Sequence, residues 1–171
     1  HFRATVMGES YPSDDSAMSA ILKLGLDDVQ RQVALVEDVV VANINCPGQV
    51  VISGKKAAVL KATDLLKAEG AKAIPLPVSG AFHSPLMQPA SDKLADYMSR
   101  VTITNSDIPI YLNRTASPTV DADDLRKNVS VQVVSSVLWT DSVMNMAQAH
   151  SDFVECGSGR VLAGLVKKIL P

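Results

Sequence analysis

The chain has 171 residues, of which 47% are hydrophobic and 20% charged, and its formal net charge is −2. This composition is that of an ordinary globular protein, and the near-neutral charge argues against a nucleic-acid partner. No apolar run approaches the ~20 residues of a membrane-spanning helix, so no membrane partner is expected. Cys46 and Cys156 fit no metal-ligand spacing. They are expected to be free thiols in a reducing compartment, the cytoplasm or else the mitochondrion or plastid.

The first residues predict the end of a helix. The chain starts with His1-Phe2-Arg3, without an initiator Met or a signal-peptide pattern. Such a start is expected of a fragment of a longer protein.

The next segment predicts a strand, a helix and a second strand. Apolar residues alternate from Met18 to Leu24, which is the pattern of a half-buried strand. Asp27 is placed to cap a helix whose valines, at positions 29, 33 and 36, fall on one face. A further strand run follows from 39 to 46.

The segment continues as a hairpin, a helix and a last strand. Pro47-Gly48 suits the central positions of a type II turn and predicts a hairpin between strands 39–46 and 49–53. A Lys- and Ala-rich helix is predicted from about 55 to 69, and Gly70 ends it. Prolines in the strand at 74–78 cannot donate to a ladder and favour an edge position. The order βαββαβ predicts a ferredoxin-like subdomain.

Beyond residue 80, strand and helix patterns alternate. The expected elements are a helix opened by Ser84 and Pro85, a strand at 108–112, helices at 121–134 and 140–150, a strand at 153–156 and a helix ending at Leu170. This alternation predicts part of a parallel α/β sheet.

His83 lies where the strand-like run ends and the helix at Ser84 begins. A helix N-terminus disfavours the protonated imidazole, so His83 is expected to be neutral near pH 7 and able to accept a proton. The alternative is a histidine that only fills space or caps the turn. The chain has no G-x-S-x-G nucleophile elbow for such a base to activate.

Three runs of the sequence resemble the malonyl-CoA:acyl carrier protein transacylase family. They are NINCPGQVVISG at 43–54, GAFHSPLM at 80–87 and ECGSGRVLAGL at 155–165. The family carries N-x-N-x-P-G-Q-V-V-I-x-G, F-H-S-x-L-M and E-x-G-P-G-x-V-L-x-G-L in the same order. The resemblance covers essentially the whole chain and predicts membership of this family.

The resemblance implies roles for five residues. His83 matches the catalytic general base, and Arg3 matches the arginine that pairs with the malonyl carboxylate, a pairing that suits a planar guanidinium. Gln132 matches a glutamine whose backbone carbonyl orients the histidine in place of a triad acid. Asn45 corresponds to a hairpin asparagine facing the active site, and Phe82 to a residue associated with malonyl selection. The alternatives are a solvated Arg3, a turn-flanking Asn45 and a Phe82 that only packs in the core.

The sequence departs from the family pattern at several places. Ala4 and Ser158 replace a glycine and a proline, and Asn113-Arg114 stands where the family has Asn-Val. The charge at position 114 has no assigned role. The family's G-H-S-x-G serine and its oxyanion hole have no counterpart here and are expected in a segment that precedes Arg3.

The implied fold is α/β, with residues 1–14 and 80–171 as part of an α/β-hydrolase-like parallel-sheet core. A ferredoxin-like subdomain at 15–79 is inserted in it. The implied reaction transfers malonyl from CoA to the phosphopantetheine thiol of acyl carrier protein through an acyl-serine, for fatty-acid biosynthesis. The partners are malonyl-CoA, acyl carrier protein and the serine-bearing segment. CoA enters as the substrate thioester, and no metal or other cofactor is needed.

Two alternatives to a stand-alone transacylase remain at this point. One is the acyltransferase domain of a polyketide or multidomain fatty-acid synthase. The other is a non-catalytic ferredoxin-like binding module. Without the serine, the 171 residues alone are expected to be inactive.

Overall fold

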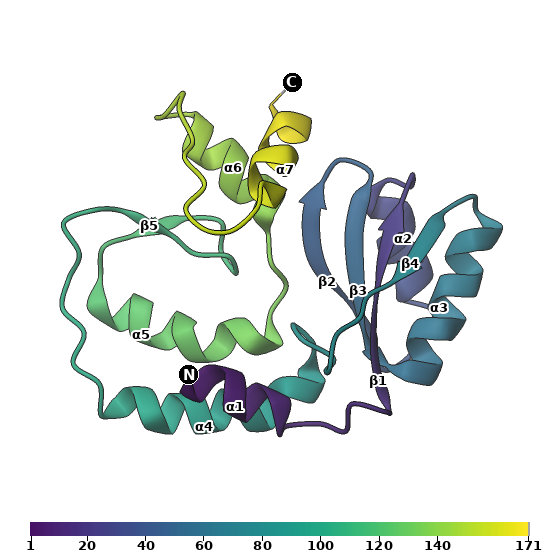
Figure 1. The fold of residues 1–171 in the computed structure, drawn as a ribbon, viewed down its shortest axis with the longest axis horizontal. Coiled ribbons are helices and arrows are strands. Elements are labelled where there is room, and N and C mark those ends of the chain that lie inside the picture. The colour runs from purple at the N-terminus through teal and green to yellow at the C-terminus, as the bar shows by residue number, and fades with distance from the viewer. Residues whose placement is uncertain (171) are drawn as a thin grey trace.

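The computed structural model describes residues 1–170 (Figure 1). Its helices are α1 (Phe2–Gly8), α2 (Leu26–Val33), α3 (Lys56–Ala68), α4 (Gln88–Ser99), α5 (Ala122–Val131), α6 (Trp139–Ala147) and α7 (Val161–Ile169), with the 3-10 turns η1 (Pro85–Met87) and η2 (Gln132–Val134). Its strands are β1 (Ser16–Leu22), β2 (Val39–Cys46), β3 (Gln49–Lys55), β4 (Lys72–Pro75), β5 (Ile110–Tyr111) and β6 (Pro118–Thr119).

Strands β1 to β4 form one sheet in the order β2-β3-β1-β4, in which every neighbouring pair is antiparallel. The hairpin between β2 and β3 turns at Pro47-Gly48, as predicted, and Gly48 has the positive φ of 73° that the turn requires. The strand predicted at 74–78 is β4, which ends at Pro75; it pairs only with β1, so its edge position is confirmed. The sheet with α2 and α3 makes up the first body, on the right in Figure 1.

The first body has its main core between the sheet and helices α2 and α3. Val29 and Leu66, from the two helices, are fully buried against Ile21 and Ile52 of the central strands. The opposite face of the sheet is also covered, because Met18 belongs to a second buried cluster. The alternation in 18–24 predicted a half-buried strand, but β1 is central and buried on both faces.

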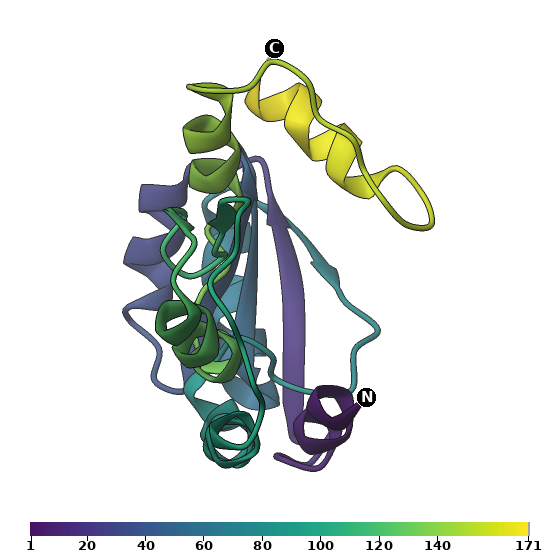
Figure 2. The same cartoon turned by 90° about the vertical axis from the view of Figure 1, so that its left-hand side faces the viewer.

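The second body contains α1, α4, α5, the two 3-10 turns and the short β5–β6 hairpin. Its core joins Val6 and Met7 of α1 to Met87, Leu94 and Val133. Helix α1 lies along α4, and α7 stands at the other end of the molecule in both views (Figure 2).

The backbone at Val137 joins the two bodies. Its N–H donates to Ala42 O at 2.8 Å, and its carbonyl accepts from Ile44 N at 2.9 Å. Asn43 and Val137 therefore form an isolated parallel bridge.

The predicted parallel sheet is not formed by residues 1–170. Apart from the bridge at Val137, all strand pairs are antiparallel, and 153–156 is a loop rather than a strand. A strand needs a neighbour to pair its backbone groups. The described residues offer none to 153–156, where Val154 is 86% exposed. The coarser expectation, an α/β fold, describes the molecule.

Two predicted helix starts differ in detail. Helix α2 begins after Gly25 rather than at Asp27, and the Asp27 carboxylate lies within its first turn. Ser84 occupies the N-cap of η1, but its hydroxyl donates back to Ala81 O at 2.6 Å instead of capping the turn. None of the helices within residues 1–170 has the length and apolar character needed to cross a bilayer.

Candidate functional site

His83 ends the segment that passes from the first body to the second. Its backbone has a φ of 59°, in the left-handed region that His enters more readily than most side chains. The conformation is held on both sides, because the N–H of His83 donates to Val133 O at 3.0 Å and the neighbouring Ala81 and Ser84 are buried. The side chain is thereby fixed at the junction of the two bodies.

The imidazole of His83 is anchored by two backbone carbonyls. Its Nδ1 lies 3.0 Å from Gln132 O and 3.1 Å from Ser135 O. A carbonyl can only accept, so Nδ1 carries the hydrogen and Nε2 of the neutral ring is left as an acceptor. The resemblance pointed to the carbonyl of Gln132. The second acceptor, on Ser135, is new, and no sequence signal marks it.

The pKa of His83 is lowered from its ordinary value of 6.5, chiefly because burial disfavours the charged ring. The hydrogen bonds to Gln132 and Ser135 act in the opposite direction, and the positive charge of Arg3 lowers the pKa further. A neutral His83 was expected from a helix N-terminus. The structure supports the neutral form but assigns it first to burial.

His83 lines a hollow of about 490 Å³ between the two bodies. The complete lining consists of Arg3, Ala4, Met7, Gly8, Met18, Asn43, Leu76, Val78, Ser79, Phe82 and His83. Arg3 is exposed and comes from α1, whereas Met18 and Asn43 come from the sheet. The fold thus brings a cation, a proton acceptor and apolar walls together, a combination suited to a small substrate with a carboxylate.

Phe82 lines the hollow and also packs in the core, and its part in malonyl selection stays a prediction. Its ring packs against the buried clusters of both bodies. Gly80 makes room for it, since a Cβ at position 80 would lie 2.9 Å from the Cε1 atom of the ring.

Asn45 is not among the residues that line the hollow, whereas Asn43 is. Register shifts in β2, between Val41 and Asn43 and again between Ile44 and Cys46, interrupt the simple alternation of sides along the strand. The run N-I-N contains both asparagines, so the sequence alone could not choose between them. The role of Asn45 stays a prediction.

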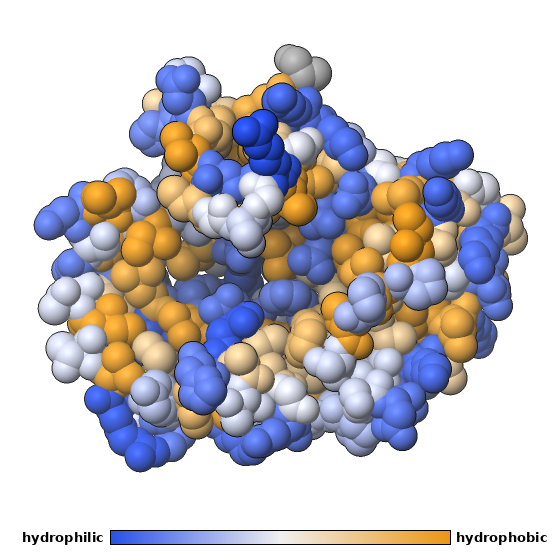
Figure 3. Space-filling view, viewed as in Figure 1, coloured by the Kyte–Doolittle hydropathy of each residue, from blue (hydrophilic) through white to orange (hydrophobic). Residues whose placement is uncertain are grey.

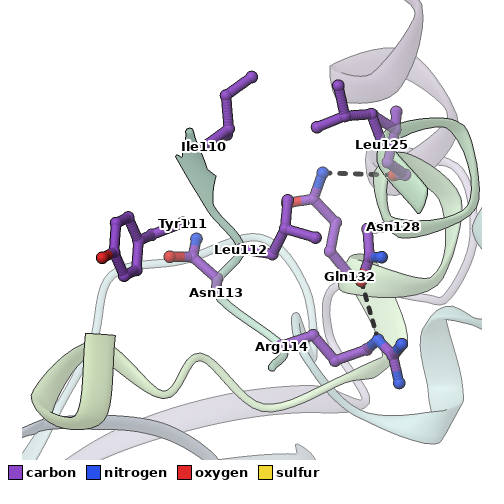
Figure 4. Close-up of a pocket in the computed structure, with 9 residues that line it drawn as sticks. Ile110, Tyr111, Leu112, Asn113, Arg114, Leu125, Asn128 and Gln132 are labelled. Atoms are coloured by element: carbon purple, nitrogen blue, oxygen red, sulfur yellow. Dashed lines mark hydrogen bonds between the residues drawn. The ribbon is translucent and has the colours of Figure 1, made fainter. Parts of the chain in front are cut away.

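A second hollow, of about 230 Å³, is drawn in Figure 4 and is lined in part by Gln132, whose carbonyl accepts from His83. Arg114, Asn128 and the side chain of Gln132 line it. The Nε of Arg114 donates to Asn128 Oδ1 at 3.0 Å, and Gln132 Nε2 donates to Val129 O at 3.3 Å. Gln132 therefore faces this hollow with its side chain and His83 with its carbonyl.

Among residues 1–170 no three His, Cys, Asp or Glu side chains come together as a metal site would require. Cys46 is a buried free thiol and Cys156 an exposed one. Figure 3 shows a depression near the middle of this face, below α7, with hydrophobic and polar residues around it.

Known proteins resemble this chain in both sequence and structure. The acyl transferase domain family matches residues 4–168. The malonyl CoA-acyl carrier protein transacylase of Bacillus subtilis (strain 168) is 39% identical over 98% of this chain and 55% of its own length. The same-named protein of Escherichia coli (strain K12) is 40% identical over 98% and 56%. The chain thus spans little more than half the length of these relatives.

Two solved structures agree with this match. The acyl-carrier-protein S-malonyltransferase from Burkholderia pseudomallei 1710b is 39% identical, with a TM-score of 0.94 over 98% of this chain and 56% of its own. A type II PKS acyl-carrier protein in complex with its malonyl-transacylase gives 37% identity and a TM-score of 0.94 over the same shares.

Proposed function

The chain belongs to the acyl transferase domain family, and on this premise we propose that it takes part in malonyl transfer from CoA to the phosphopantetheine thiol of acyl carrier protein. One observation carries the proposal: the half-buried imidazole of His83, anchored through Nδ1 on two carbonyls, shares a hollow with Arg3. The names of the relatives point to the same reaction. Its context would be fatty-acid biosynthesis in the cytoplasm.

His83 acts as the general base in this proposal. Its Nε2 takes the proton of a serine hydroxyl, whose oxygen attacks the malonyl thioester and expels the CoA thiolate, which receives that proton. In the second half, Nε2 takes the proton of the phosphopantetheine thiol, whose sulfur attacks the acyl-serine and expels the serine oxygen, which receives that proton. The CoA thioester is the substrate, and no other cofactor takes part.

Arg3 selects the malonyl group. Its exposed guanidinium, on the wall of the hollow, forms a bidentate pair with the free carboxylate. An acetyl group would leave this cation unpaired. Phe82 narrows the same hollow and thereby disfavours the branched methylmalonyl group.

The serine is supplied by residues outside these 171. Support comes from the greater length of the relatives and from exposed apolar side chains outside the first body. Val154 is 86%, Ile108 74% and Val161 71% exposed. Such surface suits contact with further polypeptide. Acyl carrier protein is the second partner, and the complex of a related transacylase with its carrier supports it.

The chain divides into two units in this proposal. Residues 15–79 form a ferredoxin-like subdomain, supported by the element order βαββαβ and the antiparallel order β2-β3-β1-β4. Residues 1–14 and 80–171 are part of an α/β-hydrolase-like core. A non-catalytic module would leave His83 and its two carbonyl anchors without a role.

The test is a chimera in which the preceding segment of the Bacillus subtilis relative is fused before residue 1. We expect malonyl transfer from malonyl-CoA to the holo carrier protein, and His83→Ala should lower its rate by about 10²–10⁴-fold. Arg3→Ala should raise the use of acetyl-CoA relative to malonyl-CoA. The 171-residue chain alone should show no transfer.

The exposed His150 provides the control, since His150→Ala should leave the rate unchanged. Near-normal transfer by His83→Ala would remove the proposed base. An unchanged acetyl-to-malonyl ratio in Arg3→Ala would remove Arg3 from substrate selection.

A further inference from the structure

Arg114 is the one departure from the family motifs that introduces a charge near the site. It is half-buried and follows β5, and its Nε donates to Asn128 Oδ1 at 3.0 Å. Within residues 1–170 its guanidinium has no carboxylate partner within 4.0 Å. The hydrogen bond of its side chain is therefore made to an amide on α5 (Figure 4).

Asn128 is well placed to transmit this contact to the helix. It is only 7% exposed, and its Nδ2 donates to Asp124 O at 2.8 Å. The amide nitrogen is committed to that carbonyl, so Oδ1 must be the atom that faces Arg114. Asn128 lies four residues before Gln132, one helical turn away on the same face.

Asn113, the neighbour of Arg114, holds the other end of the same segment. Its carbonyl accepts the N–H of Leu138 at 2.7 Å. Residues 113 and 114 thus make hydrogen bonds to the stretch 128–138 on both sides of the two carbonyls that anchor His83: Arg114 bonds to Asn128 before them, and Asn113 bonds to Leu138 after them. We call these two acceptors, Gln132 O and Ser135 O, the carbonyl platform.

We infer that Arg114 is a positioning residue for His83, acting through Asn128 on the carbonyl platform. The role of His83 as a base rests on the proposed function. The hydrogen bonds from its Nδ1 to the two carbonyls do not depend on that function. Nδ1 keeps its hydrogen only while the platform stays in line with it, and an Nε2 that carries the hydrogen cannot accept a proton. A valine at this position, as in the family pattern, would have no donor for Asn128.

The test measures the tautomer of neutral His83 by ¹⁵N NMR of the 171-residue chain. The Nδ1–H form should dominate in the wild type. In Arg114→Ala the ratio of Nε2–H to Nδ1–H should rise about fivefold, the change expected for one lost hydrogen bond. Arg114→Gln should restore the wild-type ratio, because its amide nitrogen sits as many bonds from the backbone as Nε of arginine.

Arg126→Ala is the matched control on the same helix. Arg126 donates to Val101 O at 2.6 Å and to Met98 O, both on the side of α4. Its loss should destabilise the contact between α4 and α5 without changing the tautomer ratio of His83. An equal shift in Arg126→Ala would mean general loosening of α5 and would overturn the inference.

An unchanged ratio in folded Arg114→Ala would also overturn it. If that variant does not fold, Arg114→Val, which restores the family residue, takes its place with the same expected shift.

The chimera separates this inference from the proposed function. A tautomer shift without any malonyl transfer by the wild-type chimera leaves Arg114 as a positioning residue and removes the reaction. Malonyl transfer by the wild-type chimera, with no tautomer shift in Arg114→Ala, supports the reaction and removes Arg114 as a positioning residue.

Discussion

At the scale of single residues, two neutral carbonyls hold His83 where an ordinary triad would use a carboxylate. A carboxylate would favour the imidazolium by its charge, whereas carbonyl dipoles orient the ring with a weaker effect on its protonation. Burial and the positive charge of Arg3 can then lower the pKa of His83 despite both hydrogen bonds. The ring is thereby oriented and neutral at the same time.

The lowered pKa of His83 predicts a pH-dependent stability. Between the folded-state pKa and 6.5, the unfolded chain binds a proton at this residue that the folded chain does not. The free energy of unfolding should therefore fall as the pH drops below 6.5, and this contribution should level off below the folded-state pKa. His83→Asn, which tolerates the left-handed backbone, should lose this part of the pH dependence.

Urea unfolding at about pH 7.5 and about pH 5 measures the effect. The exposed His150 supplies the control, because His150→Asn should keep the wild-type difference between the two conditions. A wild-type difference in His83→Asn would contradict the prediction.

The sequence motifs identified the site residues that act through their side-chain type, but not those that depend on local backbone geometry. Arg3 and His83 could be assigned to one site from the motifs, and they line one hollow. Ser135 O and Asn43 could not. The direction of a carbonyl depends on the geometry of η2, and the side to which Asn43 points depends on irregular pairing in β2. Neither the carbonyl direction nor the side of the strand can be predicted from the residue type.

At the scale of elements, the end of β3 approaches the start of β2 very closely. A Cβ at Gly54 would lie 2.0 Å from Asp38 O, the carbonyl that accepts the N–H of Lys55. Lys55 Nζ also pairs with Asp38 Oδ2 at 2.7 Å. The glycine that ends the first family motif therefore has a packing reason that is independent of catalysis.

Gly54→Ala should lower the free energy of unfolding by about 3 kcal/mol, because the backbone on both sides must shift. Gly164→Ala is the matched control. Gly164 lies inside α7, and a Cβ added there would meet no atom within 4 Å, so alanine should stabilise by up to ~1 kcal/mol through helix propensity. Chemical denaturation compares the two variants, and equal effects would contradict the packing argument.

Local patterns predicted the elements whose partners are near in sequence. The valines at 29 and 33 marked α2, and Pro47-Gly48 marked the hairpin, because turn chemistry and helical periodicity are local properties. The run 153–156 has the composition of a strand but no neighbour to pair with among residues 1–170. Strand propensity alone could not distinguish the strands of the hairpin, which have a partner, from the run 153–156, which has none.

At the scale of the whole molecule, the hollow of His83 lies where the two bodies meet. Backbone bonds at Val137 cross this junction, as does the bond from Ser136 Oγ to Val41 O at 2.6 Å. Phe82 is the side chain that packs against the buried clusters of both bodies. The geometry of the site therefore depends on how the bodies are joined as well as on each body alone.

Phe82→Ala should weaken both bodies together. Since the ring is half-buried, we expect a loss of about 2 kcal/mol in the free energy of unfolding, below the ~3–5 kcal/mol of a fully buried phenylalanine. Hydrogen exchange should then be faster at amides near Met18 and near Leu94, one in each cluster.

Phe2→Ala is the control, because Phe2 stacks on Tyr97 at a centroid distance of 4.4 Å within the second body. Its loss should accelerate exchange around α1 and α4 and leave the sheet unchanged. If Phe82→Ala loosened one cluster only, its ring would belong to that body's core rather than to the junction that shapes the hollow.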